Sequence, residues 1–211
     1  MIDDLAAFVR IGPAPPDRPW VVLSMIASVD GAATIDGRSG LLGNATDQQV
    51  LRLVRAAADV VLVGAATVRA ERYRPLQAPK RLVVVSRTGD LGETAGLGTA
   101  PTTEVARPAP GDTDVDLAAL LGRFAGRVVV AEGGPSLNGQ LLAAGLVDEV
   151  FVTLSPRLVG GDAVRIATGA TAADPEPWEL RHLLHDDGYL FLRYRSRRSS
   201  SASVRSAGTA S

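Results

Sequence analysis

The sequence contains no cysteine among its 211 residues, and aromatic residues make up only 4% of the chain. The first absence excludes disulfide bonds, thiolate metal sites and a thiol nucleophile. The two histidines, His182 and His185, fall three residues apart in an expected strand, where they would point to opposite faces. We therefore expect no metal site.

Long apolar runs and an excess of positive charge are also missing. No run approaches the length needed to cross a membrane, and the acidic start of the chain lacks the apolar core of a signal peptide. A formal net charge of -1 provides no basic surface for nucleic acid. We therefore expect a cytoplasmic protein with neither a membrane nor a nucleic acid as a partner.

The hydrophobic content of 46% and the length suit one globular domain. We place this domain at residues 1–195. Residues 196–211 are of low complexity, rich in serine, and are expected to be disordered.

Short β-branched runs alternate with segments of helical periodicity along most of the chain. Strands are expected at 20–27, 60–63, 82–85, 128–131, 147–154, 179–185 and 188–195, and helices at 47–58, 116–124 and 136–145. The stretch 89–113 should be mainly loop, with a short strand possible at 102–105. The order predicts an α/β fold with a mostly parallel sheet. Asp186-Asp187-Gly188 predicts an antiparallel C-terminal hairpin.

The stretch 132–136, Glu-Gly-Gly-Pro-Ser, joins a buried strand to a helix. Glycine lets a phosphate approach the backbone N–H groups, and a helix N-terminus adds partial positive charge. Pro135 suits the first helical turn. A plain tight turn explains the same residues, and on this stretch alone it is the favoured interpretation.

Other strand ends carry polar side chains as well, and ligands collect at such ends in open α/β sheets. Thr67 could cap a helix or bind a phosphate oxygen. Ser86 and Arg87 end another strand; such an arginine is usually solvated, but beside a dinucleotide it would bind the 2′-phosphate of NADP. Asp30 follows the first strand, and the Gly- and Ser-rich loop 31–45 is a candidate substrate-facing segment.

Three blocks of the sequence together resemble the riboflavin-pathway pyrimidine reductases. The blocks are Ala-Ser-Val-Asp-Gly at 27–31, LRLVRAAADVVLVGAAT at 51–67, and the segment 130–161 with its EGGPSL and GLVDE runs. The family comprises the reductase domain of the bacterial bifunctional deaminase-reductase and its stand-alone relatives, with a three-layer dihydrofolate-reductase-like fold. The zinc motif of the deaminase half is missing.

The resemblance implies that NADPH binds across the strand ends. Its phosphates would be held by Thr67 and by the turn of Gly133, Gly134, Pro135, Ser136 and Leu137. Ala27 would lie along the nicotinamide, Ser86 and Arg87 would serve the adenosine ribose and its 2′-phosphate, and Glu71 would lie near the cofactor.

On the substrate side, the resemblance implies that Ser39, Arg55 and Glu132 face a ribosylaminouracil phosphate, with Asp30 beside the same pocket. The implied reaction is hydride transfer from NADPH to C1′ of the ring-opened ribosylamino group. Asp30, Glu132 or water could supply the proton. The family also implies a homodimer, with a contact through the helix at 136–145 and the strand after it.

The chain departs from the family pattern mainly on the substrate side. Ser24 replaces a common lysine, Leu41 replaces a tryptophan, and the run 71–76, Glu-Arg-Tyr-Arg-Pro-Leu, is atypical. Two alternatives therefore stay open: reduction of dihydrofolate or a related pterin, and nucleotide binding without turnover. If the glycine turn cradles phosphate, Gly134→Asp should abolish NADPH binding and leave the fold intact.

Overall fold

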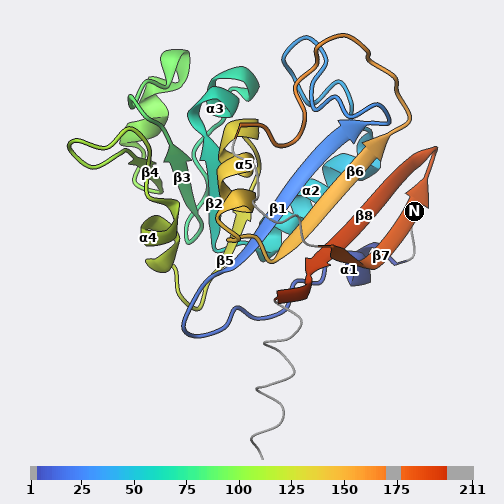
Figure 1. Cartoon of the computed structure of the whole chain (residues 1–211), viewed down its shortest axis with the longest axis horizontal. Helices are drawn as coiled ribbons and strands as arrows, with labels where there is room; N and C mark the ends of the chain where they lie inside the picture. The colour runs from blue at the N-terminus through green and yellow to red at the C-terminus, as the bar shows by residue number, and fades with distance from the viewer. Residues whose placement is uncertain (1–3, 170–176, 199–211) are drawn as a thin grey trace, which may run out of the picture.

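The centre of the molecule is an eight-stranded sheet with the order β4-β3-β2-β5-β1-β6-β8-β7 (Figure 1). The computed structural model describes residues 4–169 and 177–198. From β4 to β6 all neighbours are parallel, whereas β8 runs antiparallel to both β6 and β7. The strands are β1 (Trp20–Ser28), β2 (Val60–Gly64), β3 (Arg81–Val85), β4 (Thr103–Ala106), β5 (Val128–Ala131), β6 (Glu149–Ser155), β7 (Trp178–Asp186) and β8 (Tyr189–Ser196).

Helices cover both faces of the parallel part of this sheet. They are α1 (Leu5–Phe8), α2 (Ala45–Ala57), α3 (Ala65–Glu71), α4 (Leu117–Gly122) and α5 (Pro135–Ala143), with a 3₁₀ segment η1 (Gly92–Thr99). The first three helices and η1 pack into one core cluster, and α4 and α5 pack into the other. Figure 1 shows α5 in front of the sheet and α2 behind it.

Successive side chains of each inner strand point alternately into the two core clusters, one on each face of the sheet. Val22 of β1 points into the cluster with α2, while its neighbours Val21 and Leu23 point into the cluster with α5. Successive side chains of a strand point to opposite faces, so a run that is apolar throughout can pack against helices on both sides. The short β-branched runs of the sequence are therefore interior strands.

The predicted α/β fold with a mostly parallel sheet and an antiparallel C-terminal hairpin is confirmed. The expectation of mainly loop over 89–113 is wrong at η1, where Leu91 and Leu97 are buried. These leucines are held by tertiary packing and lack helical periodicity, so the sequence pattern gave no indication of the 3₁₀ turns. The short strand expected near 102–105 is β4.

The boundary expected after residue 195 is also too early. Ser196 is the last residue of β8, is buried, and its N–H donates to the carbonyl of Asp148 at 2.9 Å. Residues 199–211, where disorder was predicted, lie outside the described residues. Over 4–169 and 177–198, no helix combines the length and apolar character needed to cross a membrane. The cytoplasmic location and the absence of a nucleic-acid partner remain predictions.

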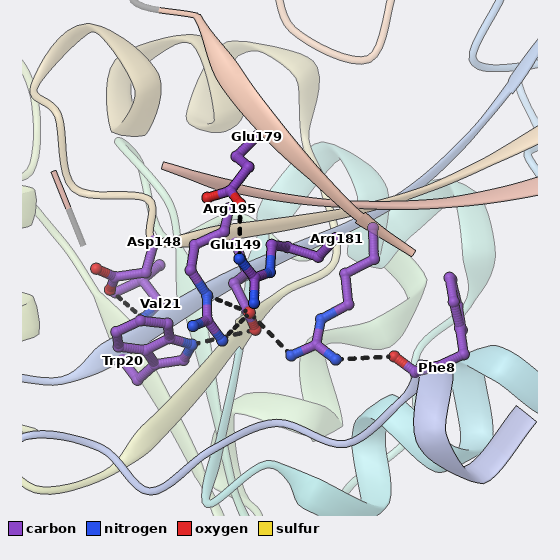
Figure 2. A network of polar contacts seen from close by, with 9 residues as sticks. Phe8, Trp20, Val21, Asp148, Glu149, Glu179, Arg181 and Arg195 are labelled. Atoms are coloured by element: carbon purple, nitrogen blue, oxygen red, sulfur yellow. Dashed lines mark hydrogen bonds and ion pairs between the residues drawn. The ribbon is translucent and has the colours of Figure 1, made fainter. Parts of the chain in front are cut away.

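An ion-pair network at the amino end of β6 ties the two ends of the chain to the sheet (Figure 2). Glu149 is fully buried, and its carboxylate accepts hydrogen bonds from Arg193 at 2.9 Å and from Arg195 at 2.7 Å. The indole of Trp20 donates to the same carboxylate at 3.3 Å. Arg193 also donates to the carbonyl of Phe8 at 3.2 Å, which fixes α1 against the hairpin.

The sheet opens at its opposite end, beyond the last pair between β1 and β5. This pair joins Leu23 to Ala131, where β5 ends, yet β1 continues to Ser28 along β6. The second half of β1 therefore has no partner on its β5 side. This gap lies at the carboxyl ends of parallel strands, the usual place for a ligand in an open α/β sheet.

Candidate active site

A cavity of about 760 Å³ occupies this opening. Its lining comes from β1, β6, α2, α3, the loop 33–43 and the turn after β5. Eight of the sequence-predicted site residues line it: Ser39, Arg55, Thr67, Glu71, Glu132, Gly133, Gly134 and Pro135. The structure therefore brings most of the predicted phosphate turn and all of the predicted substrate-side residues except Asp30 to one place.

Arg55 and Glu132 form a bidentate ion pair in this cavity, although they lie 77 positions apart in the sequence. Arg55 Nε donates to Glu132 Oε1 at 2.5 Å, and a terminal nitrogen donates to Oε2. Tyr73 completes the group, because its hydroxyl donates to Oε2 at 2.8 Å and its ring lies 5.4 Å from the guanidinium. This Arg55–Glu132–Tyr73 cluster leaves both carboxylate oxygens engaged.

Two members of the cluster, Tyr73 and Arg55, keep a fixed protonation state. Burial raises the pKa of Tyr73, and the charge of Glu132 raises it further, so the phenol stays protonated and donates. Burial lowers the pKa of Arg55, but the hydrogen bond and charge of Glu132 outweigh that effect and raise it. The arginine therefore stays cationic. A paired carboxylate of this kind acts as an acceptor and an anchor for Arg55.

The glycine turn has a packing reason that the sequence did not reveal. A Cβ on Gly134 would come within 3.2 Å of the Cα of Gly64, and the N–H of Gly64 donates to the carbonyl of Gly133 at 2.9 Å. Both turn glycines have positive φ, 102° and 84°. Gly134→Asp would therefore strain the backbone and press against Gly64 at the end of β2, so we expect a loss of stability beside the predicted loss of NADPH binding.

The same close approach sets two helix N-termini side by side. Gly64 precedes α3 and Gly134 precedes α5, and Thr67 and Pro135 from their first turns line the cavity. The first N–H groups of a helix have no partner within the helix and attract anions. Two such ends around one opening fit the diphosphate of a dinucleotide. Ser136 is exposed and Leu137 is buried, and neither lines the cavity.

Ser39 and Glu71, expected on different sides of the pocket, contact one another. The backbone N–H and the hydroxyl of Ser39 donate to one oxygen of Glu71, at 2.8 and 2.9 Å. Glu71 ends α3, so this contact holds the loop 31–43 over the cavity. Its carboxylate acts here as an anchor for that loop.

Three further predicted cofactor residues, Ala27, Ser86 and Arg87, lie outside the cavity lining. Ala27 is buried in β1, one residue beyond Ile26, which does line it. Ser86 is buried after β3, and its hydroxyl accepts from the N–H of Gly89 at 2.8 Å. Arg87 is exposed beside it. Arg87 is therefore accessible at the carboxyl end of β3. The neighbouring strand, β2, leads into α3 and Thr67.

Asp30 is anchored by hydrogen bonds just beyond the end of β1, and its role in catalysis stays a prediction. Its carboxylate accepts from the Ser28 hydroxyl and from the N–H groups of Val159 and Gly160, the latter two at 3.0 and 2.7 Å. The Ser28 hydrogen bond and then these backbone donors lower its pKa to about 2. Asp30 does not line the cavity, and so low a pKa makes it a poor proton donor.

Tyr73 and Asp47 are two of the cavity residues that were not predicted. Tyr73 lies in the run 71–76, and the atypical sequence there was the available indication. Asp47 is in the first turn of α2, where an acidic residue is ordinary. Burial raises the pKa of Asp47, and a hydrogen bond with Thr153 partly opposes the rise. Over the described ranges, no group of acidic or histidine side chains is arranged to hold a metal ion.

Comparison with known proteins gives a consistent result. The model of the RibD C-terminal domain matches residues 19–188. The 2,5-diamino-6-ribosylamino-4(3H)-pyrimidinone 5′-phosphate reductase of Methanothermobacter thermautotrophicus is 33% identical, over 74% of this chain and 87% of its own length. The riboflavin biosynthesis protein RibD of Escherichia coli is 29% identical, and the match covers 71% of this chain and 52% of RibD. The chain thus spans about half of RibD.

Solved structures confirm the predicted fold. A pyrimidine reductase-like protein from Corynebacterium diphtheriae superposes with a TM-score of 0.69 at 24% identity, covering 85% of this chain and 92% of the other. A dihydrofolate reductase from Enterococcus faecalis, complexed with NADP(H), gives 0.58 at 15% identity, covering 84% and 96%. Both likenesses are at the level of the fold, which is dihydrofolate-reductase-like as expected.

Proposed function

We propose, from the premise that this chain belongs to the RibD C-terminal domain family, that it reduces a ribosylaminopyrimidine 5′-phosphate with NADPH in riboflavin biosynthesis. Relatives named as reductases of this pathway make a nicotinamide cofactor the expectation for the family. The observation that carries the proposal is one cavity that joins two helix N-termini to the Arg55–Glu132–Tyr73 cluster. One side suits a dinucleotide diphosphate, and the other suits a polar substrate.

The cofactor side of the cavity supports this proposal. The first turns of α3 and α5 would bind the diphosphate through backbone N–H groups, and Thr67 adds a hydroxyl. Arg87, exposed after β3, would bind the 2′-phosphate and so favour NADPH over NADH. When bound, the cofactor supplies a hydride, and the protein supplies position and exclusion of water.

On the substrate side, two hydrogen bonds to Glu132 fix the orientation of the Arg55 guanidinium. Arg55 uses Nε and one terminal nitrogen on Glu132, and among the described residues its other terminal nitrogen makes no hydrogen bond. That nitrogen would bind an oxygen of the substrate or its phosphate. Reduction of the ring-opened imine adds a hydride to C1′ and a proton to the attached nitrogen. The product is the ribitylamino compound.

The direct test is NADPH oxidation followed by absorbance, with ribosylaminopyrimidine phosphates and dihydrofolate as parallel substrates. Turnover of a ribosylaminopyrimidine phosphate supports the proposal. Turnover of dihydrofolate alone would show that the enzyme reduces a pterin in place of a ribosylaminopyrimidine. NADPH binding without turnover of any of them would leave a nucleotide-binding protein.

The 2′-phosphate contact has its own test. Arg87→Ala should weaken NADPH by about tenfold or more, since a hydrogen bond to a charged group contributes about 1.5–3 kcal/mol. NADH affinity should change little, because NADH lacks the 2′-phosphate. Fluorescence titration of both nucleotides measures the difference. An equal loss for the two would remove Arg87 from the cofactor site.

We further propose that the protein is a homodimer. Leu180, Leu183 and Leu190 are exposed by 48%, 52% and 36%, and the register of the hairpin β7–β8 places them on one of its faces. Clustered apolar side chains of this kind commonly mark a protein–protein interface. Light scattering in solution tests the proposal, and the mass of a single chain would contradict it.

A further inference from the structure

Lys80 is the only lysine in the sequence, whose lysines and arginines together number 22. It is the residue before β3 and does not line the candidate active-site cavity. Its ammonium group donates to the backbone carbonyls of Ala56 at 2.8 Å and of Ala58 at 2.6 Å. Within residues 4–169 and 177–198 it pairs with no carboxylate, so its charge is directed at the carboxyl end of α2.

The carboxyl end of α2 lacks the cap that helices commonly have. The helix ends at Ala57, and Ala58 after it is extended, with φ −78° and ψ 139°. A glycine in the left-handed conformation, which often satisfies the last carbonyls of a helix, is therefore missing at this position. These carbonyls need donors from elsewhere, and the helix dipole favours a cation near them. Lys80 supplies both the donors and the charge.

The last turn of α2 carries Arg55, the cation on the substrate side of the cavity. Arg55 is two residues before the end of the helix, and its carbonyl accepts from the N–H of Ala58 at 3.2 Å. Helical side chains lean toward the amino end of their helix, so Arg55 extends from this turn toward Glu132. Lys80 therefore holds the stretch of backbone from which the guanidinium of Arg55 extends.

Tyr73 and Lys80 contact this turn from the two ends of one loop. The ring of Tyr73 lies 5.4 Å from the guanidinium of Arg55, and Lys80 binds the helix backbone. The main chain at Lys80 is fixed by the sheet, because the N–H of Arg81 donates to the carbonyl of Asp59 at 3.1 Å. The loop therefore supports the arginine at its side chain and at its backbone.

We propose that Lys80 is a positioning residue for Arg55, and that it acts by capping the carboxyl end of α2 with its ammonium group. The proposal rests on the proposed function for the contact between Arg55 and the substrate. The proposed diphosphate site is built from α3 and α5, and neither helix shares a hydrogen bond with the Lys80 side chain within the described residues. Loss of the Lys80 charge should therefore weaken the substrate and leave NADPH binding unchanged.

Lys80→Met tests this separation of the two ligands, because it removes the charge and the donors and keeps a long side chain. The KM of the ribosylaminopyrimidine phosphate should rise by about five- to tenfold, with one charge-assisted contact weakened. The kcat and the Kd of NADPH should stay within about twofold of wild type, as for a lost binding contact. An unchanged KM, or an equal loss of affinity for both ligands, would overturn the inference.

Lys80→Arg is the conservative variant. It keeps a cation and its N–H donors at the end of α2 and should restore most of the substrate affinity. A KM as high as that of Lys80→Met would show that charge at this position does not place Arg55.

Chemical acetylation tests the same charge without a substitution, because Lys80 is the only side-chain amine of the lysine type. A succinimidyl ester of acetic acid transfers its acetyl group to Lys80 and to the amino terminus, and the amides formed are uncharged. Acetylated Lys80→Arg is the matched control, since only its amino terminus is modified. The KM should rise on acetylation of the wild type and stay constant in the control. An equal response of the two proteins would contradict the role of Lys80.

Denaturant unfolding decides the inference without turnover. A cap that acts on the helix end alone should have the same effect on stability in the wild type and in Glu132→Gln, because Lys80 and Glu132 have no shared hydrogen-bonding atom. If Lys80 places Arg55 for Glu132, Lys80→Met should be less destabilising in the Glu132→Gln background, where the ion pair is already broken.

Equal losses in the two backgrounds would make Lys80 an ordinary helix cap and overturn the inference. A smaller loss in Glu132→Gln supports it. That result, together with no NADPH-dependent turnover of any ribosylaminopyrimidine phosphate by the wild type, would contradict the proposed function and leave the positioning of Arg55 by Lys80 standing.

Discussion

Two buried glutamates, Glu132 and Glu149, form nearly the same set of hydrogen bonds. Only Glu132 lines the candidate active-site cavity. Each carboxylate accepts from arginine and from an aromatic donor, Tyr73 for Glu132 and Trp20 for Glu149. Both carboxylates are almost inaccessible, at 2% and 0% of the side chain. Their arginines differ, since the side chain of Arg55 is 35% exposed and that of Arg193 is 6% exposed.

This difference in the arginines separates a candidate active site from a structural clamp. Arg193 donates through its other terminal nitrogen to the carbonyl of Phe8, and its Nε is buried, so this guanidinium faces protein on every side. Arg55 keeps one terminal nitrogen toward a cavity of about 760 Å³. A buried ion pair is therefore no indication of function by itself, and the accessible face of the cation is the informative feature.

The largest effect on stability is expected for Glu149→Gln. Breaking a buried pair leaves Arg193 without its counter-charge, which costs about 3–5 kcal/mol. Denaturant unfolding measures the loss. Glu93→Gln is the control, because its pair with Arg72 spans 3.8 Å between side chains that are 72% and 90% exposed. Such a pair contributes at most about 1 kcal/mol. Similar losses of unfolding free energy in the two variants would contradict a structural role for the Glu149 ion pairs.

The corresponding change in the cavity, Glu132→Gln, should affect activity more than stability. Cavity water can hydrate Arg55, so we expect the free energy of unfolding to fall by only about 1–2 kcal/mol. Loss of the anchor frees the guanidinium, and kcat/KM for NADPH-dependent reduction should fall by about 10²-fold. Unfolding and steady-state kinetics on one preparation measure both. A large loss of stability with normal activity would show that Glu132, like Glu149, has a structural role.

A smaller effect is expected for Tyr73→Phe. The variant keeps the ring beside Arg55 and removes the hydrogen bond to Glu132, which is worth about 1.5 kcal/mol because the acceptor is charged. We expect kcat/KM to fall by about tenfold and the melting temperature to change by a few degrees. Activity equal to wild type would show that Arg55 alone fixes the carboxylate.

The smallest effect is expected for an exposed carboxylate, Asp30. Its pKa is lowered from 3.8 to about 2, so its stabilising hydrogen bonds are present above the unfolded pKa and are lost as the pH falls through the folded pKa. The difference in melting temperature between wild type and Asp30→Asn should stay constant from pH 8 to about pH 5. It should shrink between about pH 4 and pH 2. A difference that varies near neutrality would assign the effect to another group.

Much of the cavity could be predicted from local patterns. The strand, glycine turn and helix at 128–145 identified the phosphate turn, and the blocks at 51–67 and 130–161 indicated Thr67, Arg55 and Glu132. Tyr73 was not predicted, because its contact with Glu132 spans 59 positions. Asp47 was not distinguishable from an ordinary acidic residue at a helix start. The hydrogen bonds from Val159 and Gly160 to Asp30 were not predictable either, because no local pattern shows which backbone N–H groups a carboxylate will meet.

The sequence by itself determined the strands, most of the helices and the family, because these depend on periodicity, turn residues and motifs that are local in the chain. The tertiary structure decided which carboxylates face the cavity, which are clamps, and why Gly134 has no side chain. Those properties depend on contacts such as Gly64 with Gly134 and Arg55 with Glu132, between segments far apart in sequence. Burial and pairing across such distances are set only when the sheet has assembled.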